Sequence, residues 1–298
     1  MNVTLQEHVQ LELCPEGFWQ LRSLLKSVLR RQILRLPERK VTEMEIRYPV
    51  TPASMRAFLE VFFTRHYLQI QNSLISYMCS PDFLDTVLSG HLRILDIGSG
   101  PAVASLAITD MLACILGCLE NLGYAPQRSM IEATYVLNDT STICLGTGQR
   151  MLTDYFRMTG NNVGRILRSQ TIGIQHGFPN NMGQLRRIAN NFGTYDIVIL
   201  SYVLTPLVEE IGFTDLVDGV AMLEASCASG GRILIVQDRF RRSLIRRVCK
   251  ALGTSSHRKE LTLHVFPDRG IGETFPYAHY CCLYEPNGQA ISRASYVA

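Results

Sequence analysis

A strand that runs into two glycines constrains the fold of this 298-residue chain more than any other feature. Residues 92–97, in which four of six side chains are apolar, predict a buried strand, and a turn over Gly98-Ser99-Gly100-Pro101 follows. A long apolar helical pattern comes next. Because glycine carries no Cβ, Gly98 and Gly100 would let a bound ligand approach the backbone closely. In doubly wound folds, nucleotides bind at this carboxyl end of a strand.

From residue 91 onward, candidate strands alternate with helical stretches. The candidate strands are residues 92–97, 133–137, 171–175, 195–201, 232–236, 261–266 and 278–284. Such alternation predicts a mainly parallel sheet, and the short separation of the last two strands predicts an antiparallel hairpin. The expected fold class is therefore α/β. We expect a Rossmann-like, doubly wound, mainly parallel seven-stranded sheet with an antiparallel C-terminal edge hairpin and an N-terminal helical cap.

The first ninety residues carry helical patterns and no strand pattern. Apolar spacing predicts one helix between Leu21 and Leu36, a second after Pro52, and a third from about residue 68 to 78. Pro37 ends the first, because proline rarely continues a helix. We therefore expect two domains, an N-terminal helical cap or lid over residues 1–90 and a ligand-binding domain over residues 91–298.

Composition and charge exclude several classes of protein. Hydrophobic residues make up 47% and charged residues 18%, which is not the composition of a disordered chain. The longest apolar run, residues 111–119, is shorter than the ~20 residues that span a bilayer, and the N-terminus shows no signal-peptide pattern. We therefore expect a cytoplasmic protein without a membrane partner. The nine cysteines form no CxxC pair, so we interpret them as reduced thiols and expect no metal site.

Three classes of ligand compete for the glycine turn. A triphosphate requires the GxxxxGK[ST] loop, and no such lysine follows here. A dinucleotide favours a third glycine, but Val103 stands at that position. The third class is S-adenosylmethionine, whose methionine end needs hydrogen-bonding groups. Asp96, just before the glycines, suits its ammonium group.

At these residues the chain resembles the class I S-adenosylmethionine-dependent methyltransferases. Residues 95–101 match the first motif of that superfamily closely. Residues 195–204 look like its fourth strand, and residues 230–236 look like its glycine turn and fifth strand. The three matches stand in the expected order, whereas residues 1–90 match no family.

The resemblance implies S-adenosylmethionine as cofactor and a set of residues around it. Asp96, Gly98 and Gly100 would line its methionine end. Asp139, at the end of the predicted second strand, would accept hydrogen bonds from the ribose hydroxyls, although it lies about twice as far from the first motif as the usual spacing of about 20 residues. The full set of expected cofactor-binding residues is Asp96, Gly98, Ser99, Gly100, Asp139, Thr140, His176, Gly177 and Ser201.

The acceptor of the methyl group is less constrained by the sequence. Residues 201–206 lack the motifs typical of methylation at exocyclic amines or at C5 of cytosine, so we expect transfer to N, O or S of a small organic molecule. Arg65, Tyr67 and Tyr202 are the candidates for the substrate pocket. No residue is identified as the catalytic base, and the oligomeric state is not predicted.

Two alternative functions remain open at the level of sequence. An rRNA or tRNA methyltransferase would use arginine, which outnumbers lysine by 25 to 4, to bind phosphates. If the arginines between Arg239 and Arg247 share one face with the first predicted helix, which carries Arg30 and Arg31, RNA is favoured over a small molecule as the acceptor. The second alternative is a non-catalytic, methyltransferase-like binding protein, which the intact glycines and Asp96 disfavour.

Overall fold

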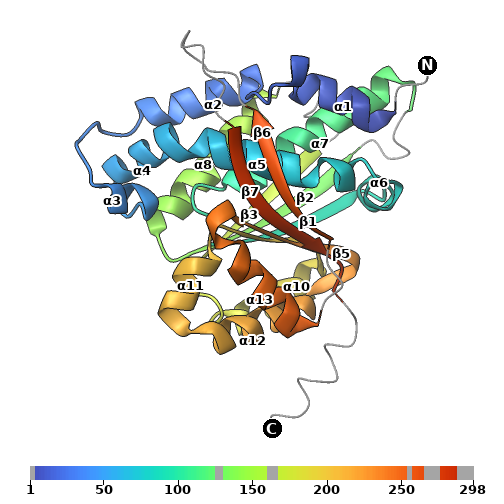
Figure 1. Ribbon diagram of the computed structural model, residues 1–298. Coiled ribbons are helices and arrows are strands. Elements are labelled where there is room, and N and C mark those ends of the chain that lie inside the picture. Colours follow the sequence, from blue (N-terminus) through green and yellow to red (C-terminus); the bar gives the residue numbers. More distant parts are fainter. Residues whose placement is uncertain (1–3, 125–129, 160–166, 254–256, 265–275, 287–298) are drawn as a thin grey trace.

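The computed structural model describes residues 4–124, 130–159, 167–253, 257–264 and 276–286. A central sheet separates two layers of helices (Figure 1). Its strands are β1 (His91–Ile97), β2 (Ile131–Asp139), β3 (Leu167–Gln175), β4 (Tyr195–Ser201), β5 (Cys227–Asp238), β6 (His257–His264) and β7 (Pro276–Tyr284).

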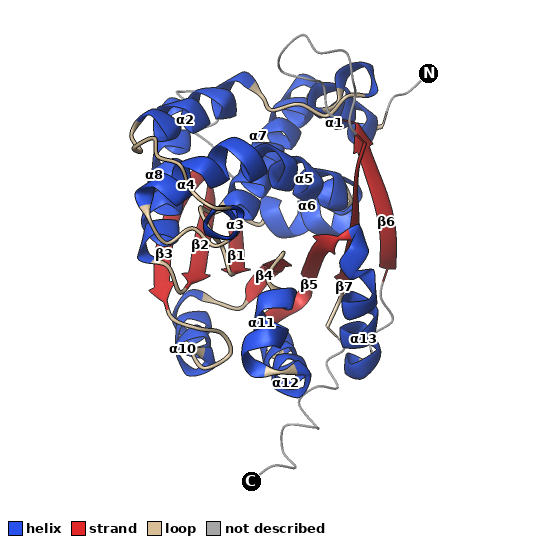
Figure 2. Cartoon of the chain, turned by 60° about the vertical axis from the view of Figure 1, so that its left-hand side comes forward, coloured by secondary structure: helices blue, strands red, loops and turns tan. Residues whose placement is uncertain are grey.

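The seven strands lie in the order β3-β2-β1-β4-β5-β7-β6, which Figure 2 shows across the sheet. Strands β1 to β5 pair in parallel, whereas β7 is antiparallel to both β5 and β6. The predicted mainly parallel α/β sheet with an antiparallel C-terminal edge is therefore confirmed. The expected strand at 261–266 begins earlier than predicted, and residues 265–266 lie outside the described residues.

Helices cover both faces of the sheet (Figures 1 and 2). One face carries α7 (Val103–Asn121) and α8 (Thr142–Met158) together with the cap. The other carries α10 (Met182–Phe192), α11 (Leu204–Ile211), α12 (Phe213–Glu224) and α13 (Arg242–Leu252). Each layer buries its own hydrophobic cluster against the sheet, which is the arrangement that strand-helix alternation predicts.

Helix α7 lies at the centre of the first layer and is buried along most of its length. By length and composition alone it is the one helix among the described residues that could cross a membrane. In its most apolar stretch of 18 residues, however, 83% of the stretch is buried inside the protein and away from its surface. Its apolar residues are thus used to build the core between the sheet and the cap.

The cap consists of short helices that follow one another before the first strand. They are α1 (Leu5–Leu13), α2 (Ser23–Leu34), α3 (Glu43–Arg47), α4 (Pro52–Phe58), α5 (Thr64–Met78) and α6 (Pro81–Leu88), with a π-helical turn, η2 (Leu59–Phe63), joining α4 to α5. Helix α1 is not among the predicted elements. Its start is stabilised by a capping box, in which Thr4 and Glu7 each bond the other's backbone N–H.

Two ion pairs fix α2 on the helices beneath it. The Arg22 guanidinium lies 3.2 Å from the buried Asp110 carboxylate of α7, and Arg35 lies 2.6 Å from Asp154 of α8. Tyr67 and Tyr155 also donate hydrogen bonds of 2.7 Å to the Asp110 carboxylate. The cap is therefore held to the sheet layer by buried polar contacts as well as by apolar packing.

Candidate functional site

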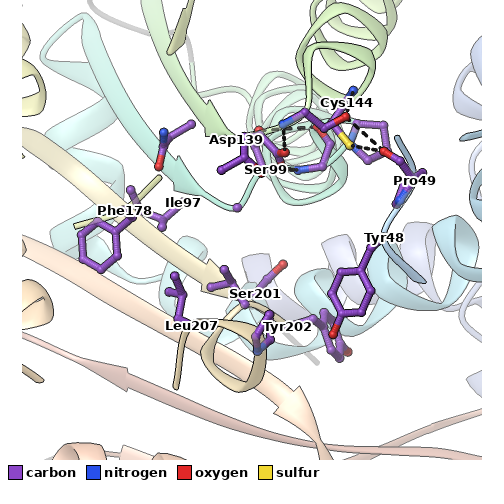
Figure 3. Close-up of a pocket in the computed structure, with 18 of the residues that line it drawn as sticks. Tyr48, Pro49, Ile97, Ser99, Asp139, Cys144, Phe178, Ser201, Tyr202 and Leu207 are labelled. Carbon is purple, nitrogen blue, oxygen red and sulfur yellow. Dashed lines mark hydrogen bonds between the residues drawn. The ribbon is translucent and has the colours of Figure 1, made fainter. Parts of the chain in front are cut away.

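A cavity of about 250 Å³ opens at the carboxyl ends of the parallel strands (Figure 3). Its walls come from the turns after β1, β2, β3 and β4, from the start of α11, and from the cap. The expected site residues that line it are Gly98, Ser99, Gly100, Asp139, Thr140, His176, Gly177, Ser201 and Tyr202. Residues far apart in the sequence therefore meet where a doubly wound sheet places its ligand sites.

The glycine turn forms the floor of this cavity. Gly98 and Gly100 have φ values of +62° and +53°, in the left-handed region where glycine carries no steric penalty. A Cβ on Gly98 would lie 2.5 Å from Cγ2 of Val203, so the turn packs tightly against the segment after β4. A Cβ on Gly100 would meet no atom within 4 Å, which leaves its backbone open to a ligand.

The Asp96 carboxylate is turned away from the cavity. It is buried and accepts hydrogen bonds from the hydroxyl of Ser105 at 2.8 Å and from the backbone N–H of Ser105 at 3.3 Å. Burial raises the pKa of Asp96 to about 7, although these hydrogen bonds oppose the shift. Asp96 is therefore placed to hold the first turn of α7 beneath the glycines. Contrary to the expectation, it does not line the cavity.

Asp139 joins the end of β2 to the glycine turn. One carboxylate oxygen accepts the N–H of Gly100 at 2.9 Å, and the other accepts the N–H of Ser141 at 2.8 Å. Burial raises the pKa of Asp139, while these backbone N–H groups act in the opposite direction. The backbone N–H of Thr140 also interacts with this carboxylate, which has about four acceptor sites and so remains able to accept a hydrogen bond from a ligand.

The turn after β3 is fixed to β2 by an amide. Asn138 donates from Nδ2 to the carbonyl of His176 at 2.8 Å and to that of Ile174 at 3.2 Å. His176 is exposed, and its Nδ1 lies 3.1 Å from the carbonyl of Gly177. The structure therefore holds this backbone in place while leaving the imidazole at the cavity mouth.

The connector between α3 and α4 supplies a wall that sequence patterns did not identify. Tyr48 and Pro49 line the cavity opposite the sheet (Figure 3). The carbonyl of Pro49 accepts hydrogen bonds from Ser141 Oγ at 3.1 Å and from Cys144 Sγ at 3.4 Å. These contacts fasten the cap over the start of α8. The connector between α3 and α4 thus forms one wall of the cavity.

Tyr202, directly after β4, faces the cavity in a conformation that is uncommon for a residue with a side chain. Its φ is +59°, and its N–H donates to the carbonyl of Val236 at 2.8 Å. The hydroxyl donates a hydrogen bond to Oε1 of Gln69, and the ring stacks on His66 with centroids 3.8 Å apart. Such backbone strain clusters at functional sites. His66, which also lines the cavity, was not among the expected site residues.

Contrary to the prediction, Arg65 and Tyr67 do not line the substrate pocket. Arg65 forms an ion pair with Asp238 at the end of β5. Tyr67 is fully buried and donates to the Asp110 carboxylate on α7. On a helix, adjacent residues point about 100° apart, so of residues 65–67 only His66 reaches the cavity.

Helices α2 and α13, which carry most of the arginines considered for binding RNA, lie on opposite sides of the sheet (Figure 1). Helix α2 belongs to the layer of the cap, and α13 belongs to the other layer. Arg22 and Arg35 are engaged by carboxylates. Arg247 covers the ring of Phe213 at 4.3 Å. The arginines of α2 and of α13 therefore do not share the one face that would favour RNA over a small acceptor.

Among the described residues, no three His, Cys, Asp or Glu side chains gather in a way that would hold a metal ion.

No protein-family model and no curated protein sequence matches the chain. Among solved structures, the chain is similar to a precorrin-8W decarboxylase of Methanobacterium thermoautotrophicum, with 11% identity, a TM-score of 0.42 and coverage of 72% of this chain and 89% of that one.

It is also similar to a precorrin-6Y C5,15-methyltransferase of Geobacter metallireducens, with 12% identity and a TM-score of 0.39 over 68% of this chain and 87% of that one. A third similar structure is the N-methyltransferase NodS of Bradyrhizobium japonicum, with 13% identity and a TM-score of 0.38 over 75% and 98% of the two chains. All three likenesses are remote.

Proposed function

We propose that the protein binds S-adenosylmethionine in this cavity and transfers its methyl group to N, O or S of a small organic acceptor. The observation that carries the proposal is the meeting of an open glycine backbone at Gly100 with the carboxylate of Asp139. The first gives room for the methionine end of the cofactor. The second offers lone pairs to the ribose hydroxyls.

The chemistry of the cavity residues fits this cofactor. No side chain fills the space above Gly100, so a ligand can contact the backbone there. His176 and Gly177 line the part of the cavity where the resemblance places the adenine. Asp96 contributes indirectly in this proposal, since its contact with Ser105 supports the turn.

The bound cofactor would supply an electrophilic methyl group on its sulfonium. The residues of the chain would then align the acceptor and exclude water, because displacement requires the nucleophile to approach in line. The cap connector, with Tyr48 and Pro49, covers the cavity and serves the second purpose. Ser201 and Tyr202 lie across the cavity from Asp139 in Figure 3, on the side we assign to the acceptor.

Isothermal titration calorimetry with S-adenosylmethionine and S-adenosylhomocysteine tests the proposal. We expect saturable binding, and we expect Asp139→Asn to weaken it by roughly 10- to 100-fold, since hydrogen bonds to charged groups contribute about 1.5–3 kcal/mol. Asp218→Asn, at an exposed position on α12, is the matched control and should bind as the wild type does. Folded protein that gives no heat with either compound would show that the proposed function is wrong.

The dependence of binding on salt separates a small acceptor from RNA. Binding to RNA weakens steeply as salt rises, because each neutralised phosphate releases counterions. We expect no tight binding of a 20-nucleotide poly(U) probe at about 150 mM salt, given that the arginines of α2 and α13 do not share a surface. Tight binding with a steep salt slope would favour RNA as the acceptor.

A further inference from the structure

The imidazole of His66, which lines the cavity, is packed among three aromatic rings. Its ring stacks on Tyr202 with an interplanar angle of 13° and on Phe62 with an angle of 21°. Phe58 meets it edge-on at 6.0 Å. Because these aromatic rings pack around the imidazole faces, the two edge nitrogens are the polar atoms that His66 can offer to a ligand.

No residue that the structure describes gives the His66 ring a hydrogen-bond partner. Burial, assisted by the neighbouring Arg65, lowers the pKa of His66 to about 3. The ring is therefore neutral at physiological pH, with one nitrogen as a donor and the other as an acceptor. A polar ring held this firmly without a protein partner is suited to bind a group of the ligand.

The π-helical turn before His66 explains how the ring reaches this position. Residues 59–63 interrupt the α-helical hydrogen bonding between α4 and α5. Phe58 and Phe62 stand eight and four residues before His66, and all three rings are in contact. Single π-helical turns are rare and are found frequently at functional sites.

Three charged side chains line the cavity, and each is paired, exposed or on the side opposite Tyr202. Arg47 is bound to Glu43 at 2.5 Å, and Glu210 is exposed on α11. Asp139 lies on the opposite side of the cavity from Tyr202 in Figure 3. An acceptor that carried a full charge next to His66 would lose hydration without gaining a counter-charge.

We propose that the acceptor is an uncharged molecule with an apolar body, and that its O–H or N–H group donates a hydrogen bond to the free ring nitrogen of His66. This inference rests on the proposed function and names the class of its acceptor. The apolar body would pack against Phe58, Tyr48 and Leu207, which line the same cavity. The hydrogen bond would orient the lone pair of the nucleophile and make His66 a residue that selects the acceptor.

Phenol, anisole and benzoate are the probes that test this proposal, because they share a ring and differ in their polar group. Each is titrated into the protein saturated with S-adenosylhomocysteine, and its dissociation constant is measured. We expect phenol to bind roughly fivefold more tightly than anisole, because one hydrogen bond contributes about 1 kcal/mol to the free energy of binding. Benzoate should bind more weakly than phenol.

His66→Phe removes the ring nitrogens and keeps an aromatic ring for the stack on Tyr202. In this variant phenol and anisole should bind equally well. His91→Phe, at an exposed position at the amino end of β1, is the matched control and should retain the preference for phenol. Thermal unfolding of each variant shows whether it is folded.

The possible results separate the acceptor class from the function itself. If S-adenosylhomocysteine fails to bind, the proposed function is wrong. If it binds but phenol does not, or benzoate binds more tightly than phenol, the proposed acceptor class is wrong. A preference for phenol over anisole that persists in His66→Phe would show that another group holds the hydroxyl.

Discussion

Gly98 and Gly100 share a left-handed backbone conformation for different reasons. At Gly98 a side chain has no room, since Val203 occupies the place where its Cβ would stand. At Gly100 a side chain would have room within the protein, and the space it would take belongs to the ligand cavity. Packing therefore requires the first glycine, whereas the proposed ligand binding requires the second.

The variants Gly98→Ala and Gly100→Ala should separate stability from binding. Gly98→Ala combines a clash with left-handed strain and should lower the free energy of unfolding by roughly 2–5 kcal/mol. Gly100→Ala carries the strain alone, about 1–2 kcal/mol, but its methyl group should weaken S-adenosylhomocysteine binding. Urea unfolding and calorimetry measure the two effects. Equal losses of stability in the two variants would contradict this division.

The buried Asp96 makes stability depend on pH in a defined direction. Its pKa in the folded protein is about 7, above the value of about 4 for an exposed aspartate. Between these values the folded state binds more protons than the unfolded state, so the contribution of Asp96 to stability falls as pH rises from 4 to 7. Above pH 7 the loss is complete.

Asp96→Asn removes this titration while keeping an oxygen near Ser105. We expect the variant to gain stability relative to the wild type as pH rises from about 4 to about 7 and to keep a constant difference above that range. Urea unfolding at a series of pH values gives the comparison. Buried carboxyls that do not interact with Asp96, such as Glu224, cancel in the difference. A constant difference from pH 4 to 8 would contradict the assignment.

At the scale of elements, α2 is held in place by a carboxylate with three partners. Asp110 is fully buried in α7 and accepts from Arg22, Tyr67 and Tyr155. The desolvation cost of such a group is offset only while its partners remain. Asp110 therefore holds the start of α2 on the sheet layer, while the Arg35–Asp154 pair holds its end.

Asp110→Ala should lower the free energy of unfolding by about 3–5 kcal/mol, because it leaves two hydroxyls without their acceptor and leaves the Arg22 guanidinium with only the backbone carbonyl of residue 110. Glu43→Ala is the control, since Glu43 forms an exposed pair with Arg47. Exposed ion pairs contribute roughly 0–1 kcal/mol to the free energy of unfolding. Chemical denaturation of both variants measures the contrast. A similar, small loss in the two would show that Asp110 is not needed to fix α2.

The sheet was more predictable than the cap because its signal is local. A strand that is buried on both faces is recognised in a sequence by its mostly apolar residues. The observed bounds of β1 and β4 agree with the predicted ranges 92–97 and 195–201 to within one residue. Helix α1 escaped prediction because its apolar positions are sparse, and its capping box between Thr4 and Glu7 is a short signal. Because β1 to β4 are parallel, their carboxyl ends lie at the same edge of the sheet.

The cavity walls from the cap could not be predicted, since they depend on contacts across long stretches of chain. Pro49 meets Ser141 92 residues away, and no local pattern specifies that contact. Arg65 and His66 differ by one helical position, and their sequence context does not tell which one faces the cavity. The spacing of four between Phe58, Phe62 and His66 is the signal that could have indicated a shared aromatic face.

At the scale of the whole molecule, the cap and the sheet share one hydrophobic cluster. It contains Leu25 and Phe63 of the cap, Leu106 and Met111 of α7, and Leu234 of β5. A boundary at residue 90 therefore divides the chain in sequence but not in its core. Elements that bury a common core unfold together, because separating them would expose its apolar surface.

Trp19 makes this cooperativity measurable. It is the single tryptophan of the chain, and it is buried within the cap. Its fluorescence therefore reports the cap, while far-ultraviolet circular dichroism reports all helices and strands. We expect the two signals to change at the same urea concentration, as in a two-state transition. A fluorescence change at lower urea would show that the cap unfolds first, and the cavity would then lose the Tyr48 wall before the sheet unfolds.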